Sequence, residues 1–195
     1  LTCRYRKQGD KSKVSVAFFG DGATNEGSFH EAVNLAAVWK LPVLFVIENN
    51  LYGFSTHYKR TMLLDDIAER AKGYGIPGVI ADGMDVEDVY EKAGDLIANA
   101  RRGNGPAILE CKTYRFRGHS RFEDPTYRTK EECEEWKKKD PILRCTARLA
   151  EQYGVDSAEI DAIEARAAER LEEAVRFAET SPDPSPQDYK KYIFA

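Results

Sequence analysis

The sequence has little of what marks membrane, fibrous or nucleic-acid-binding proteins. No run of about 18 apolar residues occurs, so no transmembrane helix is predicted. The 14 glycines and 8 prolines among 195 residues are too few for a collagen-like chain. The 29 basic and 33 acidic residues nearly balance, which argues against a dedicated nucleic-acid binder. Hydrophobic residues make up 42%, enough for the core of one ordinary globular domain rather than a disordered chain.

Cysteine is also scarce, and no CxxC pair occurs that would indicate a zinc site. We expect Cys3, Cys111, Cys133 and Cys145 to be reduced thiols in a cytoplasmic protein. No signal peptide is recognisable. The chain begins with Leu1 directly ahead of a predicted strand, so we expect it to be a piece of a longer polypeptide.

What the sequence does contain is an alternation of β-type and helical patterns. Short apolar runs predict strands at residues 14–19, 43–47, 78–81 and 107–113. Helical spacing of apolar residues lies between them, at residues 26–40, 65–72 and 86–101. Strands that alternate with helices predict an α/β fold, in which a parallel sheet is flanked by helices on both faces.

The last third of the chain is different in character. Residues 115–130 are polar and Arg-rich and predict a long loop. Helices are predicted over residues 131–138, 141–152 and 157–178, the last with Asp156 and Glu159 able to cap its start. We interpret residues 1–195 as a single, N-terminally incomplete domain, with residues 131–195 as its helical extension.

Two short motifs stand where predicted strands end. Gly20-Asp21-Gly22-Ala23 follows the first strand, and Asn49-Asn50 follows the second. The carboxyl ends of parallel strands form the ligand crevice of such sheets, so Asp21 and Asn50 should lie close together. A carboxylate and an amide oxygen suit Mg²⁺, while glycines and a helix N-terminus suit a phosphate. Each motif alone is typical of a plain turn, but together they predict a metal-bound diphosphate.

The sequence around these motifs resembles a known family. The segments are GDGATNEGSFHEAVNLAAVWKLPVLFVIENNLYGFST, IAERAKGYGIPG, DGMDV, GPAILECKTYRFRGHS, YRT and DPI. They are similar to the alpha subunit of the thiamine diphosphate-dependent first (dehydrogenase) component of 2-oxo acid dehydrogenase complexes, of the pyruvate or acetoin dehydrogenase type. The resemblance covers nearly the whole chain and implies the thiamine diphosphate-binding fold. Family members carry further residues before the position of Leu1, including a Tyr-Arg pair that grips the diphosphate.

The resemblance also implies roles for individual residues. Asp21, the Asn50 side chain and the Tyr52 carbonyl would bind Mg²⁺. Thiamine diphosphate would contact the same residues and the backbone of Gly20, Gly22 and Ala23.

One histidine matches the family's catalytic residue. His119 would lie on a mobile loop, residues 115–130, near the cofactor. Considered alone, a histidine in a basic loop is typical of a surface residue. Ser120 matches a serine that is phosphorylated in mitochondrial members, and we treat it as unmodified. Arg117 stands where some branches have a second histidine, which leaves the substrate open.

The implied activity is that of an oxidoreductase with a lipoamide acceptor. The enzyme would decarboxylate pyruvate or another 2-oxo acid and pass the acyl group to a lipoyl-bearing acyltransferase. Cleavage of acetoin by the same chemistry is the alternative. The family's activating glutamate comes from a beta subunit, and no candidate for it is found in this chain, so an alpha-beta heterotetramer is expected.

Three other interpretations stay open. A transketolase or simple decarboxylase would share the cofactor, but the HSRFEDPTYR loop argues against both. A non-catalytic assembly fragment would keep the metal ligands as relics. Basic and aromatic residues alternate in the loop at residues 112–130, as in single-strand nucleic-acid binders. The negative net charge disfavours that binding, and neither nucleic acid nor a membrane is expected as a partner.

Overall fold

The computed structural model describes residues 12–120 and 126–188. The chain divides into two compact units, the first ending at Cys145 and the second beginning at Thr146. Cys3 and residues 121–125 of the predicted loop lie outside the described residues. In the part that is described, no helix is long and apolar enough to cross a membrane.

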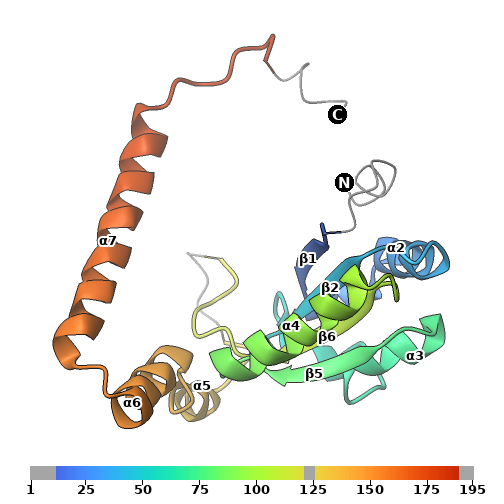
Figure 1. Cartoon of the computed structure of the whole chain (residues 1–195), viewed down its shortest axis with the longest axis horizontal. Helices are drawn as coiled ribbons and strands as arrows, with labels where there is room; N and C mark the ends of the chain where they lie inside the picture. The colour runs from blue at the N-terminus through green and yellow to red at the C-terminus, as the bar shows by residue number, and fades with distance from the viewer. Residues whose placement is uncertain (1–11, 121–125, 189–195) are drawn as a thin grey trace. The chain divides into compact units, whose positions relative to one another are not determined.

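The first unit is built on a parallel sheet of β1 (Ser15–Gly20), β2 (Val43–Asn49), β6 (Ala107–Lys112) and β5 (Gly78–Asp82), in that spatial order (Figure 1). All neighbouring pairs are parallel, and Gly20 lies in register with Glu48. The predicted strands are therefore confirmed to within about two residues at each end. Because β1 and β2 are neighbours, the chain segments that follow them emerge at the same edge of the sheet.

Helices cover both faces of this sheet, as predicted. Strand β2 shows why, because its side chains alternate between two hydrophobic clusters. Phe45 and Ile47 pack with residues of α2 (Gly27–Val38) and α3 (Ala71–Tyr74). Leu44 and Val46 pack with residues of α4 (Val86–Arg101), which lies over β2 and β6 in Figure 1.

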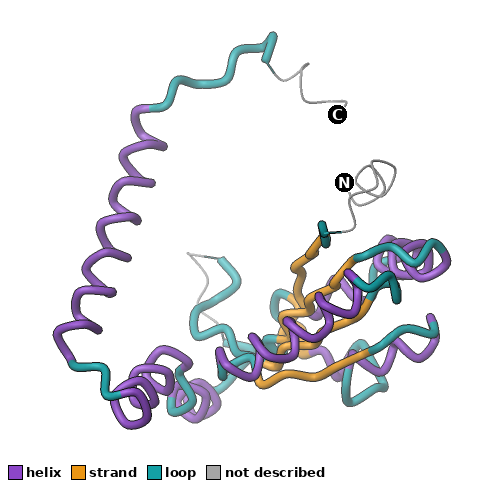
Figure 2. Tube along the Cα trace, in the orientation of Figure 1, coloured by secondary structure: helices purple, strands orange, loops and turns teal. Residues whose placement is uncertain are grey.

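The connections at the carboxyl edge are more elaborate than the sequence predicted. A 3-10 helix, η1 (Asp21–Asn25), stands between β1 and α2. The helix predicted over residues 65–72 is a 3-10 helix, η3 (Ile67–Arg70), continued by α3. After β2 the chain forms a small antiparallel hairpin of β3 (Tyr52–Gly53) and β4 (Thr56–His57), then η2 (Tyr58–Arg60). Figure 2 shows these loops gathered around the strands.

Three helices follow the loop, near their predicted positions. They are α5 (Lys130–Lys137), α6 (Pro141–Tyr153) and α7 (Ser157–Thr180). The Asp156 side chain accepts a hydrogen bond from the Glu159 amide at 2.9 Å, which confirms the predicted cap of α7.

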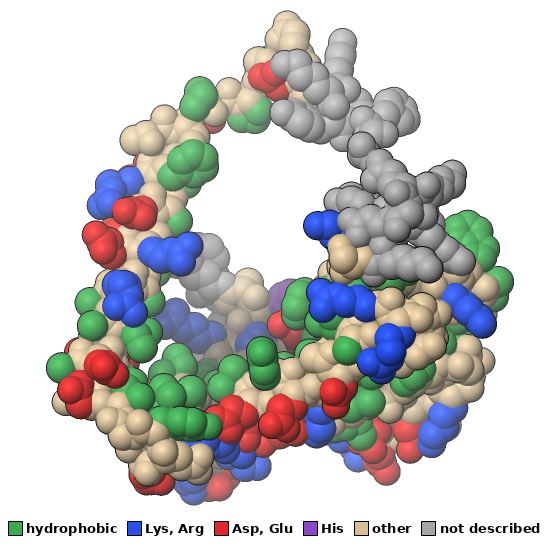
Figure 3. Space-filling model, in the orientation of Figure 1, with side chains coloured by type: hydrophobic (Ala, Val, Ile, Leu, Met, Phe, Trp, Pro, Cys, Tyr) green, Lys and Arg blue, Asp and Glu red, His purple; other side chains and the backbone are tan. Residues whose placement is uncertain are grey.

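Helix α7 buries none of its side chains in its own unit. Hydrophobic, basic and acidic side chains are all exposed along it in Figure 3. The division between the units falls within α6, and the assignment of residues 131–195 to the domain of the sheet stays a prediction.

Candidate functional site

Asp21 is a buried acid whose carboxylate accepts no hydrogen bond of normal geometry. It follows β1 directly and is only 1% exposed. Burial raises the pKa of the Asp21 carboxyl, and the nearby amides of Asp21 and Asn50, together with Coulombic attraction to Arg115 and His57, offset only part of that rise. An ionised carboxylate in such a place is costly unless a cation compensates it. Binding of a cation at Asp21 would therefore be favourable.

The structure brings the predicted metal ligands to the same edge. Asn50 follows β2, and its backbone amide lies close enough to the Asp21 carboxylate to lower the pKa of that carboxyl. The Asn50 side-chain oxygen accepts a hydrogen bond from the Tyr52 amide at 3.4 Å. Strand β3, which begins at Tyr52, packs against η1. A carboxylate, an amide oxygen and backbone carbonyls are hard oxygen donors, so these residues fit Mg²⁺.

Metals that prefer soft ligands fit less well. Among residues 12–120 and 126–188, no group of three or more His, Cys, Asp or Glu side chains is placed to hold a metal ion. Soft ligands of the kind that select zinc therefore do not gather in that part of the chain.

Gly20 and Gly22 of the first motif differ in their surroundings. A Cβ on Gly22 would lie 3.2 Å from the Cα of Gly53, so glycine lets η1 and the hairpin approach closely. A Cβ on Gly20 would meet nothing within 4 Å, which leaves that side open to a ligand. The helix predicted over residues 26–40 is confirmed as α2, and a 3-10 turn that was not predicted separates it from β1. Because η1 intervenes, α2 starts at Gly27.

His119 lies against the hairpin that carries Tyr52. Its exposed ring packs edge-on against Phe54, with ring centres 4.9 Å apart. The Arg115 guanidinium donates to the His119 Nδ1 at 3.1 Å and to the Phe54 carbonyl at 2.8 Å. A guanidinium can only donate, so Nδ1 accepts and the ring proton is on Nε2. The histidine therefore presents a donor on its other nitrogen.

Arg128 holds the start of the loop. Its guanidinium donates to the carbonyl of Arg115, to that of Phe116 at 3.1 Å and to that of Arg117 at 2.8 Å. It also lies 5.1 Å from the ring centre of Tyr114. Three successive carbonyls are thus fixed just before His119.

A second contact ties the hairpin to α5. The Tyr52 hydroxyl donates to the Glu132 carboxylate at 3.0 Å. Burial, together with Glu132, raises the pKa of Tyr52 to about 12, so the phenol remains a proton donor at neutral pH. This contact involves only the side chain of Tyr52, not the backbone carbonyl that is predicted to bind the metal.

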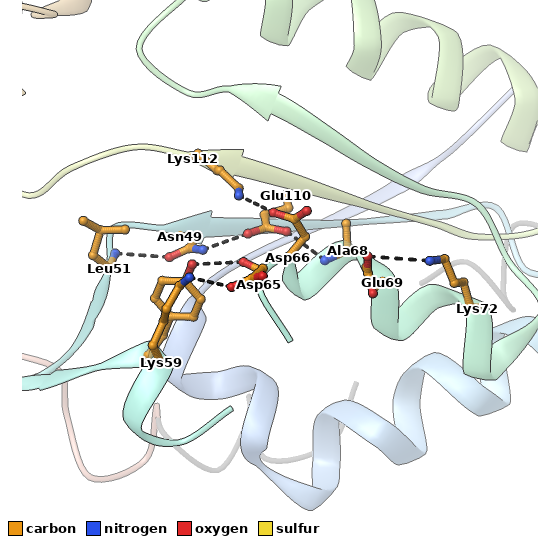
Figure 4. Close-up of polar contacts among 11 residues, drawn as sticks. Asn49, Leu51, Lys59, Asp65, Asp66, Ala68, Glu69, Lys72, Glu110 and Lys112 are labelled. Carbon is orange, nitrogen blue, oxygen red and sulfur yellow. Dashed lines mark hydrogen bonds and ion pairs between the residues drawn. The ribbon is translucent and has the colours of Figure 1, made fainter. Parts of the chain in front are cut away.

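Sequence reasoning missed a buried polar pair next to the site. Asn49 and Glu110 are both fully buried, and the Asn49 amide donates to the Glu110 carboxylate at 2.7 Å (Figure 4). The only sequence signal is one acid inside the otherwise apolar run Ala107–Leu109 and Cys111.

Comparisons with known proteins show which family the chain resembles. The sequence model of the family "Dehydrogenase E1 component" matches residues 2–187. The alpha subunit of acetoin:2,6-dichlorophenolindophenol oxidoreductase from Bacillus subtilis is 46% identical over 94% of this chain and 54% of its own length. The pyruvate dehydrogenase E1 alpha subunit of Porphyra purpurea is 38% identical over 97% of this chain and 55% of its own. The chloroplastic pyruvate dehydrogenase E1 alpha-3 subunit of Arabidopsis thaliana is 41% identical over 100% of this chain and 46% of its own length.

The chain spans about half the length of these curated relatives. The family match, in contrast, covers nearly all of the chain, including both motifs, the hairpin and the loop with His119. The expected fold, a parallel sheet between helices, is present as well. The chain therefore belongs to the dehydrogenase E1 component family.

Proposed function

We propose that this chain is the alpha subunit of a thiamine diphosphate-dependent dehydrogenase that decarboxylates pyruvate or a similar 2-oxo acid. The observation that carries the proposal is the Asp21 carboxylate, which is buried beside Asn50, accepts no hydrogen bond of normal geometry at either oxygen and has a raised pKa. The proposal is also supported by the chain's membership of the dehydrogenase E1 component family and by its similarity to a pyruvate dehydrogenase E1 alpha subunit. When bound, thiamine diphosphate supplies the nucleophilic carbon and accepts the electron pair of the cleaved bond.

In this proposal the chain's own residues hold the cofactor's charged end. Asp21, the Asn50 side chain and the Tyr52 carbonyl bind Mg²⁺, and Mg²⁺ neutralises the buried carboxylate. Gly20, Gly22 and Ala23 present backbone to the diphosphate, supported by the open space at Gly20. The close contact of Gly22 with Gly53 keeps η1 and the hairpin at a constant separation.

His119 is the proposed catalytic residue. With Nδ1 occupied by Arg115, its Nε2–H donates to the substrate oxygen and moves a proton there. Arg115 and Phe54 orient the ring.

The acceptor and the partners follow from the family. The acyl group passes to a lipoyl group on an acyltransferase, and a beta subunit completes an alpha-beta heterotetramer. We also propose a cytoplasmic location, supported by the free thiols of Cys111, Cys133 and Cys145. The Arabidopsis thaliana relative is named chloroplastic, so a plastid is the alternative.

Acetoin is the second candidate substrate. Relatives named acetoin:2,6-dichlorophenolindophenol oxidoreductase are 46% and 43% identical, compared with 38–41% for the pyruvate dehydrogenase relatives. The same cation site and the same histidine would serve either substrate.

The test is a calorimetric titration of thiamine diphosphate, with and without Mg²⁺, into the full chain assembled with its beta partner. We expect binding that requires Mg²⁺ and that is lost in Asp21→Ala. Turnover of pyruvate and of acetoin is then compared in the same assembly. Absence of binding in the intact assembly would refute the catalytic proposal and favour the non-catalytic assembly fragment.

A further inference from the structure

Glu110 is an acid in the core that the proposed chemistry does not use. It lies on β6, its side chain is 0% exposed, and both of its oxygens accept hydrogen bonds. One oxygen accepts from the Asn49 side-chain amide at 2.7 Å, and the other accepts from the Ala68 backbone amide at 2.8 Å. Such a group is retained in a core only where its donors are well placed.

The contact with Glu110 sets the orientation of the Asn49 side chain. A carboxylate only accepts, so Asn49 must turn its nitrogen toward Glu110. Its oxygen therefore points the other way and accepts from the Leu51 amide at 3.1 Å, as Figure 4 shows. This bond closes a turn in which Leu51 adopts a φ of 75°, a conformation that costs free energy for a residue other than glycine.

That turn contains the proposed cation ligands. Leu51 stands between Asn50 and Tyr52, so its unusual backbone angle determines how the Asn50 side chain and the Tyr52 carbonyl are presented. The chain Glu110–Asn49–Leu51 is thus a hydrogen-bonded relay from the middle of the sheet to the site.

The other end of the relay reaches the Asp21 side of the site. Ala68 belongs to η3, and Arg70 of the same short helix donates to the Thr24 carbonyl at 2.7 Å and to the Asn25 side chain at 2.6 Å. Thr24 in turn donates to the Asp21 carbonyl at 2.6 Å. Both ligand segments are therefore tied to η3.

A neighbouring cation balances the buried acid. Lys112 lies two residues along β6 from Glu110 and is ion-paired with Asp66, which directly precedes η3 (Figure 4). Burial lowers the pKa of Lys112, but Asp66 and Glu110 more than offset this effect and leave its pKa raised. Lys112 therefore stays charged.

We propose that Glu110 is a positioning residue for the divalent cation, acting through the Asn49 amide on the Leu51 turn. This inference rests on the proposed function, because it needs the cation site at Asp21 and Asn50. Residues that orient metal ligands from behind typically change metal affinity about 10–100-fold when altered.

The test uses a reversal of hydrogen-bond polarity. In Glu110→Gln the side chain has one donor and one acceptor, so it cannot accept from both Asn49 and Ala68. Adding Asn49→Asp restores all three bonds, with only the one between positions 49 and 110 reversed in direction. The new amide at position 110 would accept from Ala68 and donate to position 49, whose second oxygen would accept from Leu51. The matched control is Glu48→Gln, the same change at an exposed residue of β2.

Two quantities are measured in the full chain assembled with its beta partner. Mn²⁺ replaces Mg²⁺, and its binding in the presence of thiamine diphosphate is followed by electron paramagnetic resonance. Amide exchange of a peptide covering residues 50–53 is followed by mass spectrometry in metal-free protein. We expect Glu110→Gln to bind Mn²⁺ about tenfold or more weakly and to exchange faster, the double variant to regain both properties, and Glu48→Gln to match wild type.

The outcomes separate this inference from the proposed function. If wild type does not bind Mn²⁺, or if Asp21→Ala binds it equally well, the proposed function fails and the role of Glu110 fails with it. If wild type binds through Asp21 but Glu110→Gln binds as tightly, only the relay is wrong. If the double variant folds but does not regain Mn²⁺ affinity, the relay is also wrong. This comparison is decisive even if Glu110→Gln alone does not fold.

Discussion

Asp21→Asn should make the metal-free chain more stable while abolishing its response to Mg²⁺. The wild-type carboxylate is 1% exposed, and neither oxygen accepts a hydrogen bond of normal geometry. An ionised group in that state carries a penalty of several kcal/mol, whereas a buried amide without partners costs about 1–3 kcal/mol. The difference predicts a gain of about 1–2 kcal/mol in the free energy of unfolding at pH 8. The Thr24 bond to the backbone carbonyl of residue 21 is unaffected by the change.

The gain should depend on pH in a defined direction. Burial raises the pKa of Asp21 above its ordinary value of 3.8 in the folded chain. Wild type therefore loses stability as the pH rises through that raised pKa, and the asparagine variant does not. The difference between the two proteins should vanish near pH 4 and below and reach its full size at neutral pH.

The assay is urea unfolding of the full chain, in a chelator and then with Mg²⁺ and thiamine diphosphate. At a ligand concentration about 100 times the dissociation constant, wild type should gain about 2.7 kcal/mol and Asp21→Asn nothing. An asparagine variant that is less stable than wild type without metal would show that the carboxylate has a stabilising partner. A variant that still responds to Mg²⁺ would place the cation elsewhere.

Three further changes probe the surroundings of the site. Gly53→Ala places a Cβ 3.1 Å from the Gly22 Cα and should lower the free energy of unfolding by about 1–3 kcal/mol. The matched change Gly94→Ala, in open space within α4, should raise the free energy of unfolding by about 0.5–1 kcal/mol. Urea unfolding measures both effects. Burial raises the pKa of the Cys111 thiol to about 11, so iodoacetamide at pH 8 should modify it far more slowly than the partly exposed cysteines, as mass spectrometry would show. Arg128→Lys keeps the charge but replaces the two guanidinium nitrogens that reach the three carbonyls with a single ammonium nitrogen, so protease cleavage at residues 115–120 should be about tenfold faster, and an unchanged rate would contradict the assigned role of Arg128.

The sheet was predictable because its signals are local and strong. Apolar runs such as residues 43–47 and 107–113 allow little besides buried strands, and the helices between them require parallel pairing. The proximity of Asp21 and Asn50 follows from that topology alone, since both residues end neighbouring strands.

The details at the carboxyl edge were not predictable in the same way. A 3-10 turn at residues 21–25 has no hydrophobic period, and a hairpin with two residues in each strand is too short for alternation to show. The positive φ of Leu51 could not be anticipated either, because no glycine marks it.

Glu110 shows where local reasoning ends. An acid inside an apolar strand has no local explanation, because its partners come from β2 and from η3, distant in sequence from each other and from β6. A buried carboxylate and a strained Leu51 each cost free energy by themselves. Asn49 donates to the Glu110 carboxylate and accepts from the Leu51 amide, so one side chain stabilises both the buried acid and the strained turn. Asp21 accepts no hydrogen bond of normal geometry, and this difference between two equally buried acids is the physical reason to expect a cation at Asp21 and a positioning role at Glu110.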